Sequence, residues 1–551
     1  NFRQKTMDLG SLTLVDPYVS LFNYQRLRPA PIKDIKAITP SPLDSALNWN
    51  EGGWVIRIAR LDIKNGTFKN DAYTHTPTRT GFDGRHIEFG QINASFADVL
   101  WEKDTVTTKL DLKTRERSGF EVKNMHADVK LTPKEMAFSN LDIQTNNSRI
   151  RNFFRMSYDD ISAMNNFEER VRMQANFDDS EIDSDDIAYF APGMSNWKKY
   201  ITLKGQVRGT VDDLMGRNLL ITAGNNTLLN GDISMTGLPD INETFIDFRA
   251  NDFRTTYDDA LAFVPELRNV TTPRLRELEY LKFNGSFTGF IRDFVTFGVL
   301  QTKLGIVRSD LNMKLPAGRD PVYSGTVSTE YFRLGEFLGD ENIGAIAVNT
   351  SVKGKGFNER SRFVDIDGTV RFADYKGYRY DNLTLKGQLD KKKFEGIASM
   401  NDEEASFTLN GLIDFNQETP TFNFFADVQT ANLKNLNLTK EDISFQGRFN
   451  LDFTGDNIDN FLGTATISQA VITNDGVPLP FDSLVVSSYF ENDVKTLTAR
   501  SNEFEINVNG DFSIRELPDA TKLFLNKYYP AYITPPKSMP GEQALNFDIK
   551  T

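Results

Sequence analysis

Apolar and polar residues alternate strictly through long stretches of this chain. In residues 503–514 (EFEINVNGDFSI) every even-numbered residue is apolar or glycine, and every odd-numbered residue is polar. A period of two is typical of a β-strand with one face in water and the other face out of it. The same pattern recurs in residues 281–289, 363–372, 405–415 and 444–455. The chain must therefore be largely β. The central question is what its apolar strand faces pack against.

Turn-forming dipeptides punctuate or interrupt these strand-like segments. Asn-Gly occurs at 65–66, 230–231, 284–285, 410–411 and 509–510, and it is the dipeptide most typical of tight hairpins. The sequence therefore reads as strand after strand with short connections, which predicts antiparallel pairing. We expect roughly 30 to 40 strands of ordinary length in the chain.

Glycine often falls on the apolar parity, as at Gly285, Gly411, Gly447 and Gly510. A glycine inside a strand weakens it and usually marks a bulge, a bend or a close approach of another group. Two interpretations stay open. The glycines mark isolated bulges that increase local twist, or they mark bends that curl the sheet about its apolar face.

Helical segments are few and short. The sequence predicts them at 184–194, with Ser184 as N-cap, and at 255–268, 333–339 and 517–533. The last of these either caps a joint between modules or plugs the apolar face. Four short helices cannot cover every apolar strand face, so most of those faces must be shielded in another way.

A degenerate repeat indicates modules of several strands added end to end. The segments GQVRGTVDDL (205–214) and GSFTGFIRDF (285–294) share the pattern G-x-h-x-G-x-h-x-D-h, where h is apolar, and 447–461 is a looser copy. Repeats of this kind are typical of solenoids.

The chain is divided here into an N-terminal β region (1–200), repeated β-groove modules (201–533), and a linker that starts the next module (534–551). Residues 25–50 are Pro-rich and are expected to form a loop. The last residues, NFDIKT, read as a strand that is cut short, so we expect the chain to be a piece of a longer protein.

Composition and charge argue against several classes of function. The net charge is −13 without a Lys/Arg stripe, which makes nucleic acid an unsuitable partner and favours repulsion from an anionic membrane. The chain has no cysteine, which excludes disulfides, thiolate metal sites and a Cys nucleophile. No apolar run has the length of a transmembrane helix, and no signal peptide is recognisable.

Residues with catalytic or metal-binding chemistry do not form a recognisable motif. His75, His86 and His126 lack metal-site spacing. The acidic run 178–186 (DDSEIDSDD) lacks the glycine and the terminal glutamate of an EF-hand. Phosphate-binding, dinucleotide and G-x-S-x-G motifs are missing as well. We therefore expect a protein that is not an enzyme and that uses no cofactor.

Three architectures would shield the apolar faces. A β-sandwich pairs two sheets, a closed barrel seals the face inside, and a trough curls one long sheet so that its apolar face lines the inside. The trough is the expectation adopted here: an all-β fold in which a long antiparallel sheet of repeated modules curls into an elongated apolar groove, with a few short helices. Its expected lining residues, which would equally suit an ordinary core, are Phe283, Phe287, Val364, Ile366, Phe372, Phe407, Leu409, Phe445, Phe449, Phe453, Phe504, Ile506, Val508 and Phe512.

The chain resembles the TamB family of the AsmA-like group of bacterial envelope proteins. Its sequence pattern is most similar to that of TamB-like proteins from the Bacteroidota. The resemblance covers nearly the whole chain and rests on pattern. The segments that carry it are RYDNLTLKGQLDKKKFEGIASMNDEEASFTLNGLIDF (379–415), LTLVDPYVSLFNY (12–24), WVIRIARLDIKNGTFKND (54–71) and FLNKYYPAY (524–532).

The resemblance implies a lipid conduit. TamB proteins cross the periplasm as a β-trough, are tethered to the inner membrane by an N-terminal helix, and are implicated in moving phospholipids toward the outer membrane and in outer-membrane protein assembly. Expected partners are phospholipid acyl chains and, through a region outside this chain, a barrel protein of the TamA or BamA type.

A different class stays open as the alternative: a secreted β-repeat adhesin or glycan-binding protein with closed β-sandwich cores. A β-helical polysaccharide enzyme would need a convergent acidic cluster, which the sequence does not reveal.

Overall fold

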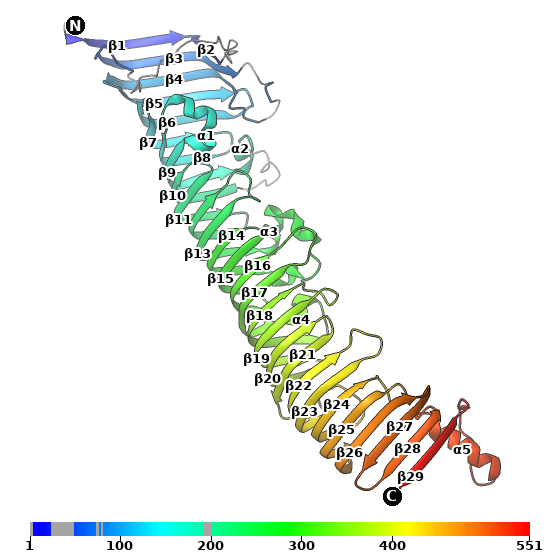
Figure 1. The fold of residues 1–551 in the computed structure, drawn as a ribbon. Helices are drawn as coiled ribbons and strands as arrows, with labels where there is room; N and C mark the ends of the chain where they lie inside the picture. Colours follow the sequence, from blue (N-terminus) through cyan, green and yellow to red (C-terminus); the bar gives the residue numbers. More distant parts are fainter. Residues whose placement is uncertain (1–3, 24–48, 73–75, 79–80, 191–199) are drawn as a thin grey trace, which may run out of the picture. The chain divides into compact units, whose positions relative to one another are not determined.

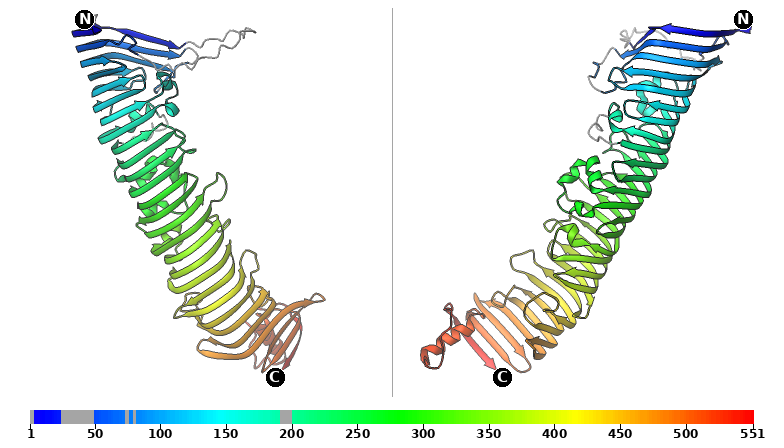
Figure 2. Two further views of the ribbon diagram at one scale, coloured as in Figure 1. Left: turned by 60° about the vertical axis from the view of Figure 1, so that its left-hand side comes forward. Right: turned by 180° about the vertical axis from the view of Figure 1, so that it is seen from behind.

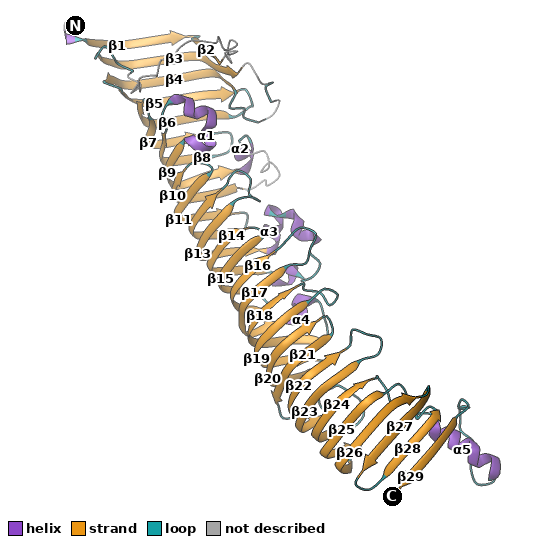
Figure 3. Ribbon diagram, in the orientation of Figure 1, coloured by secondary structure: helices purple, strands orange, loops and turns teal. Residues whose placement is uncertain are grey.

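The computed structural model describes residues 4–23, 49–72, 76–78, 81–190 and 200–551, and it is an all-β structure (Figure 1). Strands make up 64% and helices 9% of the structure, and the 29 strands form one sheet that is not closed. Strands dominate Figure 3, where helices are short and few. The predicted fold class is confirmed, and the strand number lies just below the expected range.

The sheet begins with two parallel strands, which the sequence did not predict. Strands β1 (Thr6–Val15) and β2 (Tyr18–Asn23) both pair in parallel with successive halves of the long strand β3 (Val55–Ala72). Between them Asp16, with a positive φ of 49°, and Pro17 interrupt the strand. The expected loop at 25–50 lies almost entirely outside the described residues. Local turn signals did not predict the parallel pairing because it depends on the long connection between β2 and β3.

All further pairings that the structure records are antiparallel and join neighbours in sequence. From β3 onward in the first unit they follow the order β4 (His86–Glu102), β5 (Thr105–Glu116), β6 (Glu121–Thr132), β7 (Glu135–Gln144), β8 (Arg149–Ser157), β9 (Arg172–Asp183), β10 (Tyr200–Gly209), β11 (Asp213–Ala223), β12 (Thr227–Thr236), β13 (Phe245–Thr256) and β14 (Tyr280–Phe290).

Strand β15 (Asp293–Thr302) follows. The antiparallel run of the second unit consists of β16 (Gly305–Lys314), β17 (Val322–Arg333), β18 (Ile343–Lys355), β19 (Phe363–Tyr375), β20 (Tyr378–Asp390), β21 (Lys393–Asn401), β22 (Ala405–Asp414), β23 (Thr421–Asn432), β24 (Ile443–Thr454), β25 (Leu462–Asn474), β26 (Val477–Glu491), β27 (Val494–Ser501), β28 (Glu505–Asp511) and β29 (Ala544–Lys550).

The chain divides into two compact units. The first comprises Asn1–Val270 and Glu279–Phe294, and the second comprises Thr271–Leu278 and Val295–Thr551. The division between the two units therefore lies near residue 294. The boundaries that the sequence predicts near residues 200 and 533 stay predictions.

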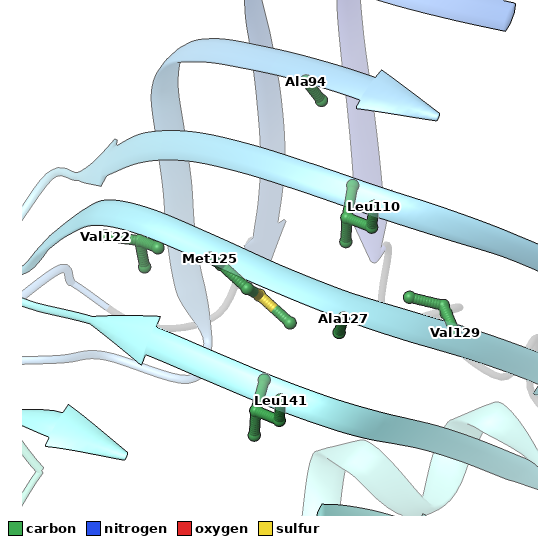
Figure 4. Packing of buried hydrophobic residues seen from close by; sticks show 7 residues of the cluster. All are labelled: Ala94, Leu110, Val122, Met125, Ala127, Val129 and Leu141. Atoms are coloured by element: carbon green, nitrogen blue, oxygen red, sulfur yellow. The ribbon is translucent and has the colours of Figure 1, made fainter. Parts of the chain in front are cut away.

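Each unit shields one strand face by bending its strands. Figure 2 shows the strands curving along their length. In the first unit a buried apolar cluster from β4 to β7 lies on one face (Figure 4), and its members are Ala94, Leu110, Val122, Met125, Ala127, Val129 and Leu141. Ala127 has no exposed surface. Burial of this kind on a single-layer sheet requires the sheet to wrap around its own side chains.

The strand face that is buried in this way is called the inner face. In the first unit it is the face that carries Ala127, and in the second unit it is the face that carries Leu383, Leu385 and Leu389 of β20. Along β20 the inner residues are half-buried, while the residues between them, such as Lys386, are exposed. The opposite side of the sheet is the outer face.

The bulge interpretation holds at two of the strand glycines, and the interpretation as bends that curl the sheet stays a prediction. Gly285 and Gly447 lie at irregularities of the ladder, where β13 and β25 carry extra residues. Gly411, by contrast, lies in an unbroken register and pairs with Gly396, which pairs with Gly387. This row of inner-face glycines has positive φ at Gly396 (154°) and Gly411 (143°), so here glycine permits a backbone that other residues rarely adopt.

The degenerate repeat encodes a tight turn at the end of a strand. Its second glycine is Gly209 in one copy and Gly289 in the other, with φ of 122° and 133°. A Cβ atom would lie 2.0 Å from the carbonyl oxygen of Asp213 in the first copy and 2.4 Å from that of Asp293 in the second. Glycine and aspartate are four residues apart in both copies because the chain reverses between them.

The predicted helices exist but are shorter than expected. They form α2 (Ser184–Ala188), α3 (Tyr257–Phe263) with the 3-10 helix η4 (Pro265–Asn269), α4 (Leu334–Leu338) and α5 (Leu517–Tyr528); the 3-10 helices η2 (Ile161–Asn166) and η5 (Leu275–Leu278) and helix α1 (Phe167–Arg170) were not predicted. The N-cap of α2 is Asp183 and not Ser184, because the Asp183 carboxylate accepts a 2.8 Å hydrogen bond from the backbone N–H of Asp185.

The glycine row predicts a local loss of stability on substitution. We expect Gly396→Ala and Gly411→Ala each to lower the local opening free energy of β20–β22 by about 1–3 kcal/mol, because a Cβ would meet a backbone carbonyl oxygen at 2.3 Å. Hydrogen exchange of these strands measures the change. Gly90→Ala in β4 is the matched control, since nothing lies within 4 Å of its added Cβ. Equal effects at all three positions would contradict the argument.

Candidate functional site

The inner face of each unit is the candidate site, and most of the predicted lining residues lie on it. Phe283 and Phe287 lie on the inner face of the first unit, paired with Phe253 and Phe248 of β13. The register from β20 outward places the following predicted residues on the inner face of the second unit: Val364, Ile366, Phe407, Leu409, Phe445, Phe449, Phe453, Ile506 and Val508.

Three predicted residues do not occupy a strand position on the inner face. Phe504 and Phe512 flank β28 and are outside the strand, so strict alternation overstated its length. Phe372 lies on the outer face. In the β18–β19 pair, Val348 faces Val370 and Ala347 faces Phe372, so Arg371 is an extra residue that reverses the parity.

The contacts of Phe372 agree with its outer position. The Arg379 guanidinium lies over its ring at 4.1 Å, and the ring of the exposed residue Tyr331 lies 6.2 Å away. Phe372 is thus buried beneath outer-face side chains. The prediction that it lines the groove is wrong because one bulge changes the face of every residue beyond it.

The inner face of the second unit carries two groups of aromatic rings in contact. Phe422 lies 4.9 Å from Phe453, and Phe445 lies 5.4 Å from Phe449. Phe422 and Phe424 of β23 were not predicted, although they share a parity with Ala426 and Val428. The adjacent Phe425, which is exposed on the outer face, obscured the alternation.

The inner face is only partly covered. Every described strand belongs to the one sheet, so no described strand packs over this face as the second layer of a sandwich. Accordingly, residues such as Phe407, Phe445 and Phe449 are half-buried, where a sandwich core would bury them fully. In the second unit the arrangement is an apolar floor on which many side chains stay partly exposed.

Short connections cover parts of this floor. In the second unit Leu436, in the turn between β23 and β24, packs against Met400 and Ala405 and is 3% exposed. The hydroxyl of Tyr380 donates a 2.7 Å hydrogen bond to the Leu436 carbonyl oxygen. In the first unit η2 and α1 form a cluster over Met136 and Met156.

Charge is distributed unequally between the two faces. The outer face carries ion pairs between neighbouring strands, such as Lys386–Asp367 at 3.0 Å. In the described strands β16 to β29, Lys495 is the one charged residue on the inner face. Burial lowers the pKa of the Lys495 ammonium, and the nearby Asp459 carboxylate opposes that shift. The ammonium also donates to the Asp459 carbonyl oxygen.

A cavity of about 420 Å³ lies at the β3–β4 end of the first unit's inner face. Its lining residues include Trp49, Trp54, Ile56 and Trp101. Ile56 pairs with Trp101, and Trp101 pairs with Val106, which is on the inner face. The cavity thus continues the apolar floor in aromatic side chains.

The polar residues that invited a chemical interpretation have structural contacts. His86 lies 3.2 Å from the Asp71 carboxylate, and His126 lies 2.9 Å from that of Asp111. In the acidic run, the buried Asp186 carboxylate accepts a hydrogen bond from the Thr145 hydroxyl and a 3.0 Å hydrogen bond from the backbone N–H of Asn147. His75 lies outside the described residues. Within the described ranges no group of three His, Cys, Asp or Glu residues could hold a metal ion.

None of the helices in the described part of the chain is both long and apolar enough to cross a membrane. No family model matches the chain, and no curated protein and no solved structure is significantly similar to it.

The cover at Leu436 predicts a local effect of a single hydroxyl. We expect Tyr380→Phe to weaken the closed position of turn 433–437 by about 1 kcal/mol, through loss of one hydrogen bond. Hydrogen exchange of the turn should then become about fivefold faster, while β20 itself stays protected. Tyr375→Phe, an exposed tyrosine of β19, is the control. Unchanged exchange in Tyr380→Phe would show that packing of Leu436 alone holds the turn.

Proposed function

We propose that this protein is a lipid conduit that carries phospholipid acyl chains along its apolar trough. The observation that supports this most is the inner face itself. In the second unit it is continuous across neighbouring strands, it is almost free of charge from β16 to β29 in the described chain, and many of its side chains are half-buried without a second layer. A surface of this kind requires an apolar occupant if it is not to stay in contact with water.

The physical chemistry of the floor suits an alkyl chain. Each methylene removed from water contributes about 0.8 kcal/mol, so acyl chains would lie along the floor while headgroups stay in water. Successive strands offer apolar side chains in one row, for example Leu409, Ala426, Phe449 and Ile467. The binding energy would therefore vary little from strand to strand, and a lipid could move without large barriers.

The cellular setting of the proposal comes from the TamB resemblance. It places the protein in the periplasm, anchored to the inner membrane by an N-terminal helix outside this chain. Transport would run between the inner and outer membranes, and a barrel protein of the TamA or BamA type would be the outer-membrane partner, with a role in protein assembly there.

The adhesin or glycan-binding alternative has one supporting observation. The aromatic residues Phe297, Phe425 and Tyr331 are exposed on the outer face or outside the trough, and aromatic side chains on solvated faces are suited to stacking on sugars. The two functions differ in a simple measurement. Mass spectrometry of the purified protein finds copurified phospholipid if the trough carries lipid.

A charge on the floor should stop lipid binding. We expect Phe449→Asp and Val508→Arg each to reduce copurified phospholipid by about tenfold, because an acyl chain would have to desolvate an ion. Both residues lie on the inner face, and circular dichroism checks that the strands persist. Cells that carry the same substitutions in the full-length protein should lose envelope integrity.

The matched control is Phe425→Asp, which adds the same charge on the outer face of the strand next to Phe449. We expect it to retain lipid. If Phe449→Asp folds and retains as much lipid as the control, the conduit proposal is wrong.

A further inference from the structure

Helix α5 turns its aromatic side toward solvent. Phe524 is 60% exposed and Tyr528 is 61% exposed, with their rings 5.1 Å apart. The half-buried positions are Leu517, Ala520 and Leu523 together with Asp519 and Asn526, and the Asn526 amide donates to the carbonyl oxygen of Ile533. A surface helix usually packs its apolar stripe on the core and leaves its polar stripe in water. In α5 Leu517, Ala520 and Leu523 form the half-buried apolar stripe, and Phe524 and Tyr528 form a second, aromatic stripe that the described residues leave exposed.

The segment after the helix extends this aromatic surface. Tyr529 is exposed, Tyr532 is 88% exposed, and Met539 is also largely exposed. The backbone N–H of Tyr532 donates to the Tyr529 carbonyl oxygen at 3.1 Å, so the chain turns compactly directly after α5. Figure 1 shows α5 at the C-terminal end of the second unit, beside β29.

Lysines border the aromatic stripe on both sides. Thr521, Phe524, Leu525 and Tyr528 are three or four residues apart and share one side of the helix. At about 100° per residue, Lys522 follows one border of this stripe and Lys527 follows the other. Lys522 also lies 3.4 Å from Asp519, on the side that faces the protein.

The local charge is opposite to that of the whole chain. Residues 515–539 contain four cationic side chains and two acidic ones, whereas the whole chain has a net charge of −13. Tyrosine and phenylalanine bordered by lysine are typical of a helix in the interfacial region of a bilayer, where rings enter the acyl boundary and ammonium groups reach lipid phosphates. Charge complementarity therefore favours an anionic phospholipid surface over a protein as the occupant of this face.

We propose that α5 and residues 529–539 dock the second unit onto the surface of a bilayer that contains anionic phospholipid. The aromatic stripe inserts at headgroup depth, and Lys522, Lys527 and Lys537 contact phosphate groups. This inference goes beyond the proposed conduit and does not require the trough to carry lipid. It also refines the expectation that acidic charge repels this chain from anionic membranes, because the repulsion is local to other surfaces.

The test is flotation of the whole 551-residue chain with vesicles of phosphatidylcholine alone and of phosphatidylcholine mixed with phosphatidylglycerol. We expect binding to the mixed vesicles, and a loss of about tenfold in the double variants Phe524→Ser/Tyr528→Ser and Lys522→Glu/Lys527→Glu. The lysine variant should lose most binding at low salt, where electrostatic attraction is strongest. Tyr489→Ser/Phe425→Ser, at two exposed aromatic residues of the outer face, is the matched control.

Three results would overturn the proposal: no binding of the unmodified chain to mixed vesicles, equal binding by the control and both α5 variants, or self-association without lipid that the Phe524→Ser/Tyr528→Ser variant abolishes in light scattering. The last result would assign the face to a contact between copies. Phe449→Asp should leave vesicle binding unchanged, so this proposal and the conduit proposal fail independently.

Discussion

A single-layer sheet has no partner layer against which to bury its apolar face, and the rest of this structure follows from that constraint. Curvature is the solution that needs no further layer. Bending strands crowd the inner side chains against one another, which buries Ala127 and Val129 in the first unit and Ala426 and Val428 in the second. Glycines such as Gly396 and Gly411 let neighbouring backbones approach where an added Cβ would collide. The result is an apolar surface that shields itself only in part.

Partial shielding is also what connects the fold to the proposed transport. A fully packed core has no room for a ligand, and a flat apolar sheet would aggregate. The short connections that carry Leu436 in the second unit, and η2 in the first, cover only parts of the inner face. From β16 to β29 in the described chain, strand charge is kept on the outer face except at Lys495, and ion pairs such as Lys386–Asp367 link adjacent strands in water.

Local alternation predicted the strands and most of the floor because a side chain's face depends only on parity within one strand. Ile366 and Phe449 were placed correctly for this reason. Parity fails at bulges, and Arg371, which nothing in the alternation distinguishes, moved Phe372 to the other face. The parallel pairing of β1 and β2 with β3 depends on chain connectivity, and the solvent-facing side of α5 depends on what the helix packs against. A local sequence pattern predicts neither property.

The order of strand pairing has a consequence for how such a chain is made and how it changes in length. From β3 to β14, and again from β16 to β29, each strand pairs with its predecessor and its successor in sequence. Loop closure is therefore cheap at every step, and assembly can proceed hairpin by hairpin while the ribosome is still extending the chain. A duplicated or deleted hairpin would leave every other pairing intact, so evolution can adjust the span of this protein in increments of two strands.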